Sequence, residues 1–138
     1  MDAPLKIFAG SSHKQLAQDI CDTLGVPLGE SHTVTFSNEN MMVQIDENVR
    51  ECDVYVIQTS CPSVHSNLFE LLLMIDALRS SSAARITAVM PYFPYIRSDK
   101  KDRPRISIAA MALARRKKSQ RPRKRSKREH LVSDPLTA

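Results

Sequence analysis

Residues 53–58 read Asp-Val-Tyr-Val-Ile-Gln, and the centre of this stretch is apolar on both of its alternating faces. A strand that is apolar on both faces is typical of a parallel sheet with helices on each side. Arg85–Met90 has the same character and ends at Pro91, while Leu5–Ala9 is a shorter apolar run that ends at Gly10. We therefore predict three strands of one largely parallel sheet.

A first helix is predicted after the Leu5–Ala9 strand. Ser12 and Gln15 stand in capping-box spacing, which predicts the helix start, and Gly25 predicts its end. The side chains that share one apolar face at the helical period are Leu16, Ala17, Ile20, Cys21 and Leu24.

A second helix is predicted from the capping-box spacing of Asn67 and Glu70 and extends to about Arg79. Its side chains are apolar almost all round, which indicates that it is covered on more than one side. The sheet supplies one cover. The rest of the protein's own core or a partner subunit supplies the other.

Between the two helices the apolar period changes to two, which is typical of strands. Thr33–Phe36 and Met42–Ile45 are predicted strands joined by the polar loop Ser37–Asn40. This period alone places Phe36 among buried side chains. The order strand, helix, strands, strand, helix, strand predicts an α/β fold with right-handed crossovers.

The 138 residues suit one compact domain, with 42% hydrophobic and 25% charged residues. The net charge of +5 is unevenly distributed. Residues 1–114 hold 10 Lys/Arg and 13 Asp/Glu, a net −3, whereas residues 115–138 hold 10 Lys/Arg and 2 Asp/Glu, a net +8. We expect a domain over 1–114 and a disordered basic tail over 115–138.

The basic tail has alternative functions. A run rich in Lys and Arg can bind nucleic acid or direct nuclear import. The run at 115–128 has no interleaved aromatic side chains, so such binding would be driven by phosphate and sensitive to salt. We favour the disordered tail and do not expect nucleic acid among the partners.

Targeting and redox signals are mostly absent. Met1–Lys6 lacks the regions of a secretory signal, and Leu68–Leu78, the longest apolar stretch, is interrupted by Glu70 and Asp76 and too short to span a bilayer. Three cysteines without metal-ligand spacing are interpreted as free, buried thiols: Cys21, Cys52 and Cys61. We expect a cytoplasmic protein with no membrane contact and no metal ligands of its own.

Ligands of parallel sheets bind beyond the carboxyl ends of the strands, which directs attention to Pro91–Arg105. This segment begins with aromatic and proline residues, and five cations interleaved with two acids follow. That pattern suits a polyphosphate bound with a divalent metal ion. The alternative is a solvated charged loop. The three glycines, at 10, 25 and 29, form no Gly-rich phosphate loop.

Several stretches, taken in order, resemble one known family over about residues 5–110. They are Lys6–His13, Phe36–Asn38, Asn48–Arg50, Asp53–Gln58, Asn67–Leu78, Arg85–Tyr95, Arg97 and Asp99–Arg103. Together they resemble the N-terminal domain of ribose-phosphate diphosphokinase, the family that makes phosphoribosyl diphosphate. The resemblance implies a phosphoribosyltransferase-like, Rossmann-like α/β domain, one of two in each subunit, with the active site between them.

The resemblance also implies a reaction and partners. The family transfers the β,γ-diphosphoryl group of ATP to the anomeric hydroxyl of ribose 5-phosphate, with Mg²⁺, and its subunits form oligomers. It implies ATP binding by Phe36, Asn38, Arg97, Asp99, Lys100 and Lys101. Phe36 would stack on the adenine held by a neighbouring subunit, Asn38 would hydrogen-bond near it, and the other four would contact the phosphates. A regulatory site for phosphate or ADP is implied around Arg50, Ser81 and Ser82.

The sequence departs from the family pattern in three places. Many members have an acid where Asn40 stands, and most have Gln where Ser98 stands. After Ala110 the family continues to a metal-binding His and a second domain, which this sequence does not match. His130 lies in a different context, so no catalytic residue and no metal ligand is assigned.

Three interpretations follow from the resemblance and its limits. The chain is a truncated or alternatively ended diphosphokinase subunit with little or no activity alone. Alternatively, it is a non-catalytic regulatory subunit that joins complete subunits. The third interpretation is a nucleic-acid-binding or nuclear protein acting through its basic tail.

Overall fold

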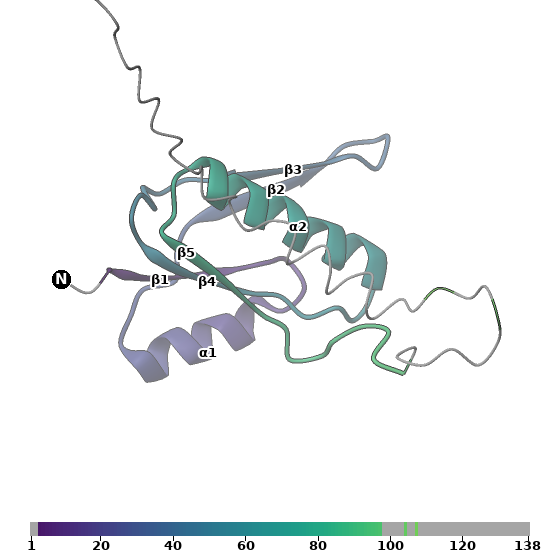
Figure 1. Ribbon diagram of the computed structural model, residues 1–138, viewed down its shortest axis with the longest axis horizontal. Helices are drawn as coiled ribbons and strands as arrows, with labels where there is room; N and C mark the ends of the chain where they lie inside the picture. Colours follow the sequence, from purple (N-terminus) through teal and green to yellow (C-terminus); the bar gives the residue numbers. More distant parts are fainter. Residues whose placement is uncertain (1–2, 98–103, 105–106, 108–138) are drawn as a thin grey trace, which may run out of the picture. The chain divides into compact units, whose positions relative to one another are not determined.

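The computed structural model describes residues 3–97, 104 and 107. The chain divides into two units, residues 1–94 and 95–138. The first unit holds these elements in chain order (Figure 1): β1 Leu5–Ala9, α1 Lys14–Leu24, β2 Ser31–Thr35, β3 Met41–Ile45, β4 Asp53–Ile57, α2 Val64–Ser80 and β5 Arg85–Val89. The predicted boundary at residue 114 and the basic tail lie outside the described residues.

The main sheet has the strand order β1-β4-β5, and both pairings are parallel. In the central register, Tyr55 of β4 lies between Ile7 of β1 and Thr87 of β5. Strands β2 and β3 form a separate antiparallel hairpin. The prediction of a largely parallel α/β sheet is confirmed.

Helices cover both faces of β1 and β4, because alternate residues of these strands join two different cores. Phe8, Val54 and Val56 pack with α2 and are fully buried. Ile7 and Ile57 pack with α1 on the other face. Figure 1 shows α1 and α2 on opposite sides of the three strands. This double burial explains why the centre of β4 is apolar on both faces.

Helix α2 is covered on two sides, as its composition predicts. Leu71, Met74 and Leu78 are fully buried in the core that includes β1 and β4. The hairpin supplies the second cover, since Val43 and Ile45 of β3 pack against the same cluster. Among the described residues, no helix is long and apolar enough to cross a membrane.

The predicted start of α1 is wrong by one cap residue. His13 is the N-cap, and its Nδ1 accepts a hydrogen bond from the Leu16 N–H at 3.0 Å. Ser12, which stands in capping-box spacing, instead donates its hydroxyl to Gln58 Oε1 at 2.7 Å. The predicted end is confirmed, since Gly25 adopts the left-handed conformation with φ 67°.

The predicted start of α2 is also wrong, because the helix begins at Val64, after Ser63. Asn67 and Glu70 lie inside the helix and are buried. Asn67 Nδ2 donates to the Pro62 carbonyl at 2.5 Å, and Glu70 accepts hydrogen bonds from the turn after β1. Asn67 therefore holds the turn just before the helix, Glu70 makes a long-range contact, and neither side chain caps the helix at the predicted place.

The three cysteines are free thiols, as predicted, but they differ in burial. Cys21 and Cys52 are buried, and burial raises the pKa of the Cys21 thiol, with a further contribution from Asp22. Cys61 is exposed in the turn between β4 and α2, so the prediction that all three are buried is wrong. Cys21 and Cys52 belong to the two cores on opposite faces of the sheet, and Cys61 belongs to neither.

Replacing a buried leucine of α2 is expected to destabilise the protein. Leu71→Ala leaves a cavity in the core and should lower the free energy of unfolding by about 2–5 kcal/mol. The matched control is Leu24→Ala on α1, whose side chain is 57% exposed and whose removal should change stability by about 0.5 kcal/mol or less. Urea denaturation measures both. Equal losses would contradict the assigned core.

Candidate functional site

The carboxyl ends of β1, β4 and β5 lie at one edge of the parallel sheet, the edge where α/β proteins bind ligands. Three segments leave the sheet there (Figure 1): Gly10–His13 after β1, Gln58–Ser63 after β4, and Met90–Pro94 after β5. Helix α2 begins at the same edge. Polar side chains join the first two segments to this helix.

Glu70 of α2 lies at the centre of these contacts although its side chain is only 1% exposed. Its carboxylate accepts hydrogen bonds from the Ser11 N–H at 3.2 Å and from Ser11 Oγ at 2.6 Å. A third donor is Gln58 Nε2, at 2.7 Å from Glu70 Oε2. Buried carboxylates need such donors because they have lost their water.

Gln58, also 1% exposed, follows β4 directly and uses both ends of its amide. Its Oε1 accepts from Ser12 Oγ at 2.7 Å, and its Nε2 donates to Glu70 and to the Asn67 carbonyl. Ser12 Oγ in turn accepts from the Thr59 N–H at 3.0 Å. We call the side chains of Ser11, Ser12, Gln58 and Glu70 the edge network.

Gly10 makes the edge network possible because a Cβ there would lie 2.0 Å from Gln58 Oε1. That distance is far shorter than any real contact, so a side chain at residue 10 and the amide of Gln58 exclude each other. Beside the network, Ser60 Oγ is buried without a hydrogen-bond partner in the part of the chain that the structure describes.

Sequence reasoning missed the edge network. Two signals pointed to it: Gln58 is a polar residue at the end of a strand buried on both faces, and Glu70 is a carboxylate inside an apolar helix. Each feature alone has an ordinary local explanation. Only the fold brings the two side chains together, across 12 residues of chain.

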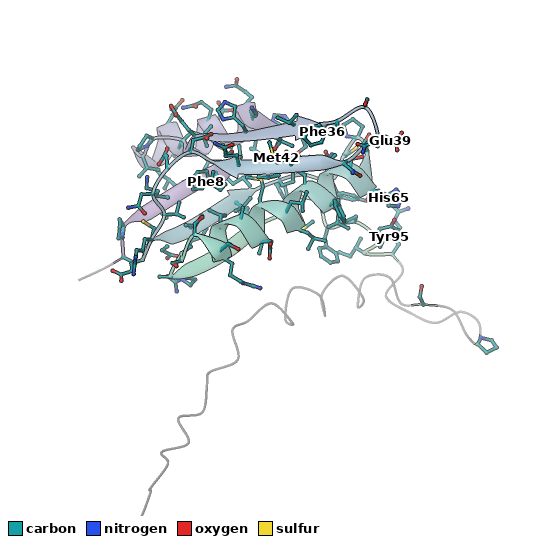
Figure 2. The ribbon with its side chains drawn as sticks, turned by 90° about the horizontal axis from the view of Figure 1, so that it is seen from above. Phe8, Phe36, Glu39, Met42, His65 and Tyr95 are labelled. Carbon is teal, nitrogen blue, oxygen red and sulfur yellow. The ribbon has the colours of Figure 1, made fainter. Side chains whose placement is uncertain are left out.

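The turn between β2 and β3 presents Phe36, whose side chain is 48% exposed. The prediction from period two alone, a buried Phe36, is therefore wrong. The turn is closed by hydrogen bonds from the Phe36 N–H to the Asn40 carbonyl at 2.8 Å and from the Asn40 N–H to Asn38 Oδ1 at 3.2 Å. Figure 2 shows Phe36 and Glu39 at the same end of the molecule as His65, in the first turn of α2.

The residues predicted to contact phosphate lie beyond β5. Arg97 is exposed and belongs to the second unit of the chain. Asp99, Lys100 and Lys101 lie outside the described residues. The structure therefore places Phe36 and Asn38 of the predicted ATP site but does not test their grouping with the other four.

The predicted regulatory residues lie at the opposite, amino edge of the sheet. The Glu51 N–H, next to exposed Arg50, donates to the Ser82 carbonyl at 3.0 Å. Ser81 Oγ donates to the Ala77 carbonyl at 2.9 Å, and Ser82 has φ 62°. The fold thus brings together the backbones around Arg50, Ser81 and Ser82, which the sequence separates by about thirty positions.

An ion pair joins β4 and β5 at the same amino edge. Arg85 Nε donates to Asp53 Oδ1 at 2.9 Å, and Arg85 Nη2 donates to the other oxygen. This bidentate hydrogen bonding lowers the pKa of Asp53 and raises that of Arg85. A second pair, Lys6 with Glu47, lowers the pKa of the Glu47 carboxyl, with help from the Glu30 N–H.

The described residues contain no group of three or more His, Cys, Asp or Glu side chains that could hold a metal ion. This statement does not cover Asp99 and Asp102, the two acids of the predicted polyphosphate segment, because they lie outside the described residues.

The sequence profile of the family described as the N-terminal domain of ribose phosphate pyrophosphokinase matches residues 5–119. The chain belongs to this family. The ribose-phosphate pyrophosphokinase of Deinococcus radiodurans is 54% identical over 112 residues, which are 81% of this chain and 35% of that protein. Ribose-phosphate pyrophosphokinase 2 of Schizosaccharomyces pombe is 49% identical over 110 residues, covering 80% of this chain and 34% of that protein.

A solved structure supports the same assignment. The crystal structure of phosphoribosylpyrophosphate synthetase from Mycobacterium smegmatis is similar with a TM-score of 0.82 and 40% sequence identity. The match covers 84% of this chain and 39% of that one. This pyrophosphokinase-family chain thus spans about a third of the length of the curated relatives it matches. The resemblance and the fold predicted from the sequence are confirmed.

Closing the space beside Gln58 should destabilise this pyrophosphokinase-family domain. Gly10→Ala forces the Gln58 amide out of place, and we expect the free energy of unfolding to fall by about 1–3 kcal/mol, the usual effect of overpacking. Chemical denaturation measures the loss. In a chain that already carries Gln58→Ala, the Gly10→Ala substitution should cause a smaller loss of stability, because the amide that it would clash with is absent. An unchanged stability in Gly10→Ala would refute the close approach.

The Asp53–Arg85 pair should give the domain an acid-sensitive contribution to stability. Since the folded pKa of Asp53 is lowered, the contribution is present above the unfolded pKa of about 4 and is lost as the pH falls through the folded value. Arg85→Met should flatten the decline of unfolding free energy below pH 4. Arg79→Met, an α2 residue outside the pair, is the control and should leave that decline unchanged. The assignment would be contradicted if Arg85→Met and the wild type lost the same amount of unfolding free energy below pH 4.

Proposed function

We propose that these residues form the nucleotide-binding N-terminal domain of a ribose-phosphate diphosphokinase. The complete enzyme transfers the β,γ-diphosphoryl group of ATP to the anomeric hydroxyl of ribose 5-phosphate, a step that supplies nucleotide biosynthesis. The observation that carries the proposal is the family match over residues 5–119, which includes every stretch that the fold places at the two edges of the sheet.

ATP would bind between two copies of the chain. The exposed ring of Phe36 offers a flat apolar surface on which adenine stacks, and Asn38 beside it offers an amide for hydrogen bonds. From the neighbouring copy, Arg97 would meet the phosphates with its planar guanidinium, together with the charged side chains Asp99, Lys100 and Lys101. A site shared in this way requires an oligomer.

Mg²⁺ would arrive on the phosphates of ATP, as part of the substrate. The ion neutralises phosphate charge when bound. The chain's own contribution is to orient the base and the phosphates.

The 138 residues alone are proposed to bind nucleotide without transferring diphosphate. Phosphoryl transfer depends almost entirely on positioning and charge stabilisation. The chain spans only about a third of the length of its pyrophosphokinase relatives, and the proposal concerns these 138 residues by themselves. We place the protein in the cytoplasm, where its free thiols suit a reducing environment.

The amino edge is proposed as a second anion site, for phosphate or ADP. Arg50 supplies charge there, and the hydrogen bond between the Glu51 N–H and the Ser82 carbonyl keeps the Ser81–Ser82 turn beside it. This grouping, made of residues far apart in sequence, supports a regulatory role.

Calorimetric titration with Mg-ATP tests the nucleotide site. Phe36→Ala should weaken binding by about 1–3 kcal/mol, the usual loss for a stacked base, and Arg97→Ala should also weaken it. Phe69→Ala is the matched control, since that ring is 57% exposed on α2, and Arg79→Ala controls for the lost charge. Affinity should rise with protein concentration. Self-association of every variant is followed by sedimentation.

Two outcomes would contradict the proposal. Binding that neither Phe36→Ala nor Arg97→Ala weakens would place the nucleotide elsewhere, and an affinity independent of the oligomer population would exclude a shared site. A separate assay for diphosphoryl transfer to ribose 5-phosphate should show no turnover by the 138 residues. Turnover near that of a complete enzyme would refute the assignment as a binding domain alone.

A further inference from the structure

We propose that Gln58 and Glu70 are positioning residues that set the nucleotide affinity of the carboxyl edge without touching the nucleotide. The proposal rests on the proposed function and adds that the nucleotide also reaches the carboxyl edge, where parallel sheets bind ligands. Both side chains are 1% exposed, so neither is available to a ligand. They act through the residues they hold: Ser11, Ser12 and Thr59.

The edge network joins the central strand of the sheet to segments that lead to its two opposite faces. Gln58 extends the central strand, Ser11 and Ser12 form the turn that leads to α1 on one face, and Glu70 belongs to α2 on the other. Without these hydrogen bonds, the turn after β1 would be attached to the sheet edge mainly through the Gly10 N–H, which donates to the Ile57 carbonyl at 3.0 Å.

Only one orientation of the Gln58 amide satisfies its neighbours. Glu70, as a carboxylate, accepts hydrogen bonds and donates none, so the Gln58 NH₂ group must face it. The Gln58 oxygen is then directed to the Ser12 hydroxyl, which is free to accept from the Thr59 N–H. Reversing the amide would place two oxygens together at Glu70. The network therefore fixes a single conformation of the turn.

A fixed turn matters for binding because ligand groups are held by backbone and side chains placed to within a fraction of an ångström. Ser11, Ser12 and Thr59 follow β1 and β4 directly at the carboxyl edge. Displacing them should weaken nucleotide binding even in a protein that remains folded. The effect is distinct from a general loss of stability.

The test is Gln58→Glu in the full chain, which replaces the NH₂ donor by an oxygen 2.7 Å from Glu70 Oε2. Two buried carboxyl groups at this distance share one proton at low pH and repel each other when both ionise. Glu70 accepts hydrogen bonds from Ser11 and Gln58, and neither of these two residues carries a charge. The variant should therefore lose the fixed turn as the pH rises.

Gln18→Glu is the matched control. Gln18 Nε2 donates to Asp22 Oδ1 at 2.8 Å, so this variant makes the same chemical change, but on the exposed face of α1. Mg-ATP affinity is measured by calorimetry at pH 5.5 and pH 8, at a temperature at which each variant is folded. The quantity compared is the dissociation constant relative to the wild type at the same pH.

We expect Gln58→Glu to bind within about threefold of the wild type at pH 5.5 and at least about tenfold more weakly at pH 8, whereas Gln18→Glu matches the wild type at both. An equal ratio at both pH values in a folded Gln58→Glu protein would overturn the positioning role and leave the proposed function intact. A wild-type chain that binds no nucleotide would overturn both.

Ser12→Ala keeps the proposal testable if Gln58→Glu does not fold. It removes the hydroxyl that Gln58 and Thr59 share but adds no charge. We expect a loss of affinity of about fivefold with the wild-type pH dependence. Wild-type affinity in this variant would likewise overturn the positioning role.

Discussion

Strand β4 is buried on both faces and flanked by a strand on each edge. Its burial sets what the other elements of the domain must provide. Its backbone groups pair with β1 and β5, while its side chains need apolar partners on two sides. Helices α1 and α2 provide those partners. The same burial extends one residue further, to Gln58, where a polar side chain enters the interior and must be fully hydrogen-bonded. Glu70, Ser12 and the absent side chain of Gly10 meet that requirement.

Features set by local patterns could be predicted from the sequence. The β4 and β5 strands follow from apolar runs, the end of α1 from Gly25, and the hairpin from its change of period. The two-sided cover of α2 follows from its composition, although the sequence does not say that β3 supplies the second side. These predictions succeed because a residue's neighbours along the chain determine the pattern.

Features set by distant partners could not be predicted. Ser12, Asn67 and Glu70 have the spacing of helix caps, but their side chains bond elsewhere. Ser12 and Glu70 have partners 46 and 59 residues away, and Asn67 donates to the Pro62 carbonyl. The exposed ring of Phe36 contradicts the period of its strand and agrees only with what the family resemblance implies for that loop. Of the candidate ATP site, the hairpin residues are placed. Asp99, Lys100 and Lys101 lie outside the described residues and remain predictions.

Different interactions stabilise the two edges of the sheet, and α2 extends from one edge to the other. At the carboxyl edge, Glu70 is buried and held by neutral donors, so altering one partner leaves another without a hydrogen bond in a dry environment. At the amino edge, the Asp53–Arg85 pair lies next to water, which screens it and limits its contribution. The 17 residues of α2 span roughly 25 Å between these edges, and their buried face is close-packed against the sheet. A disturbance that passes along α2 reaches the other edge by moving core side chains such as Leu71 and Leu78, and the backbones of β4 and β5 also run between the two edges. The packed core, more than any polar contact, joins the two candidate sites.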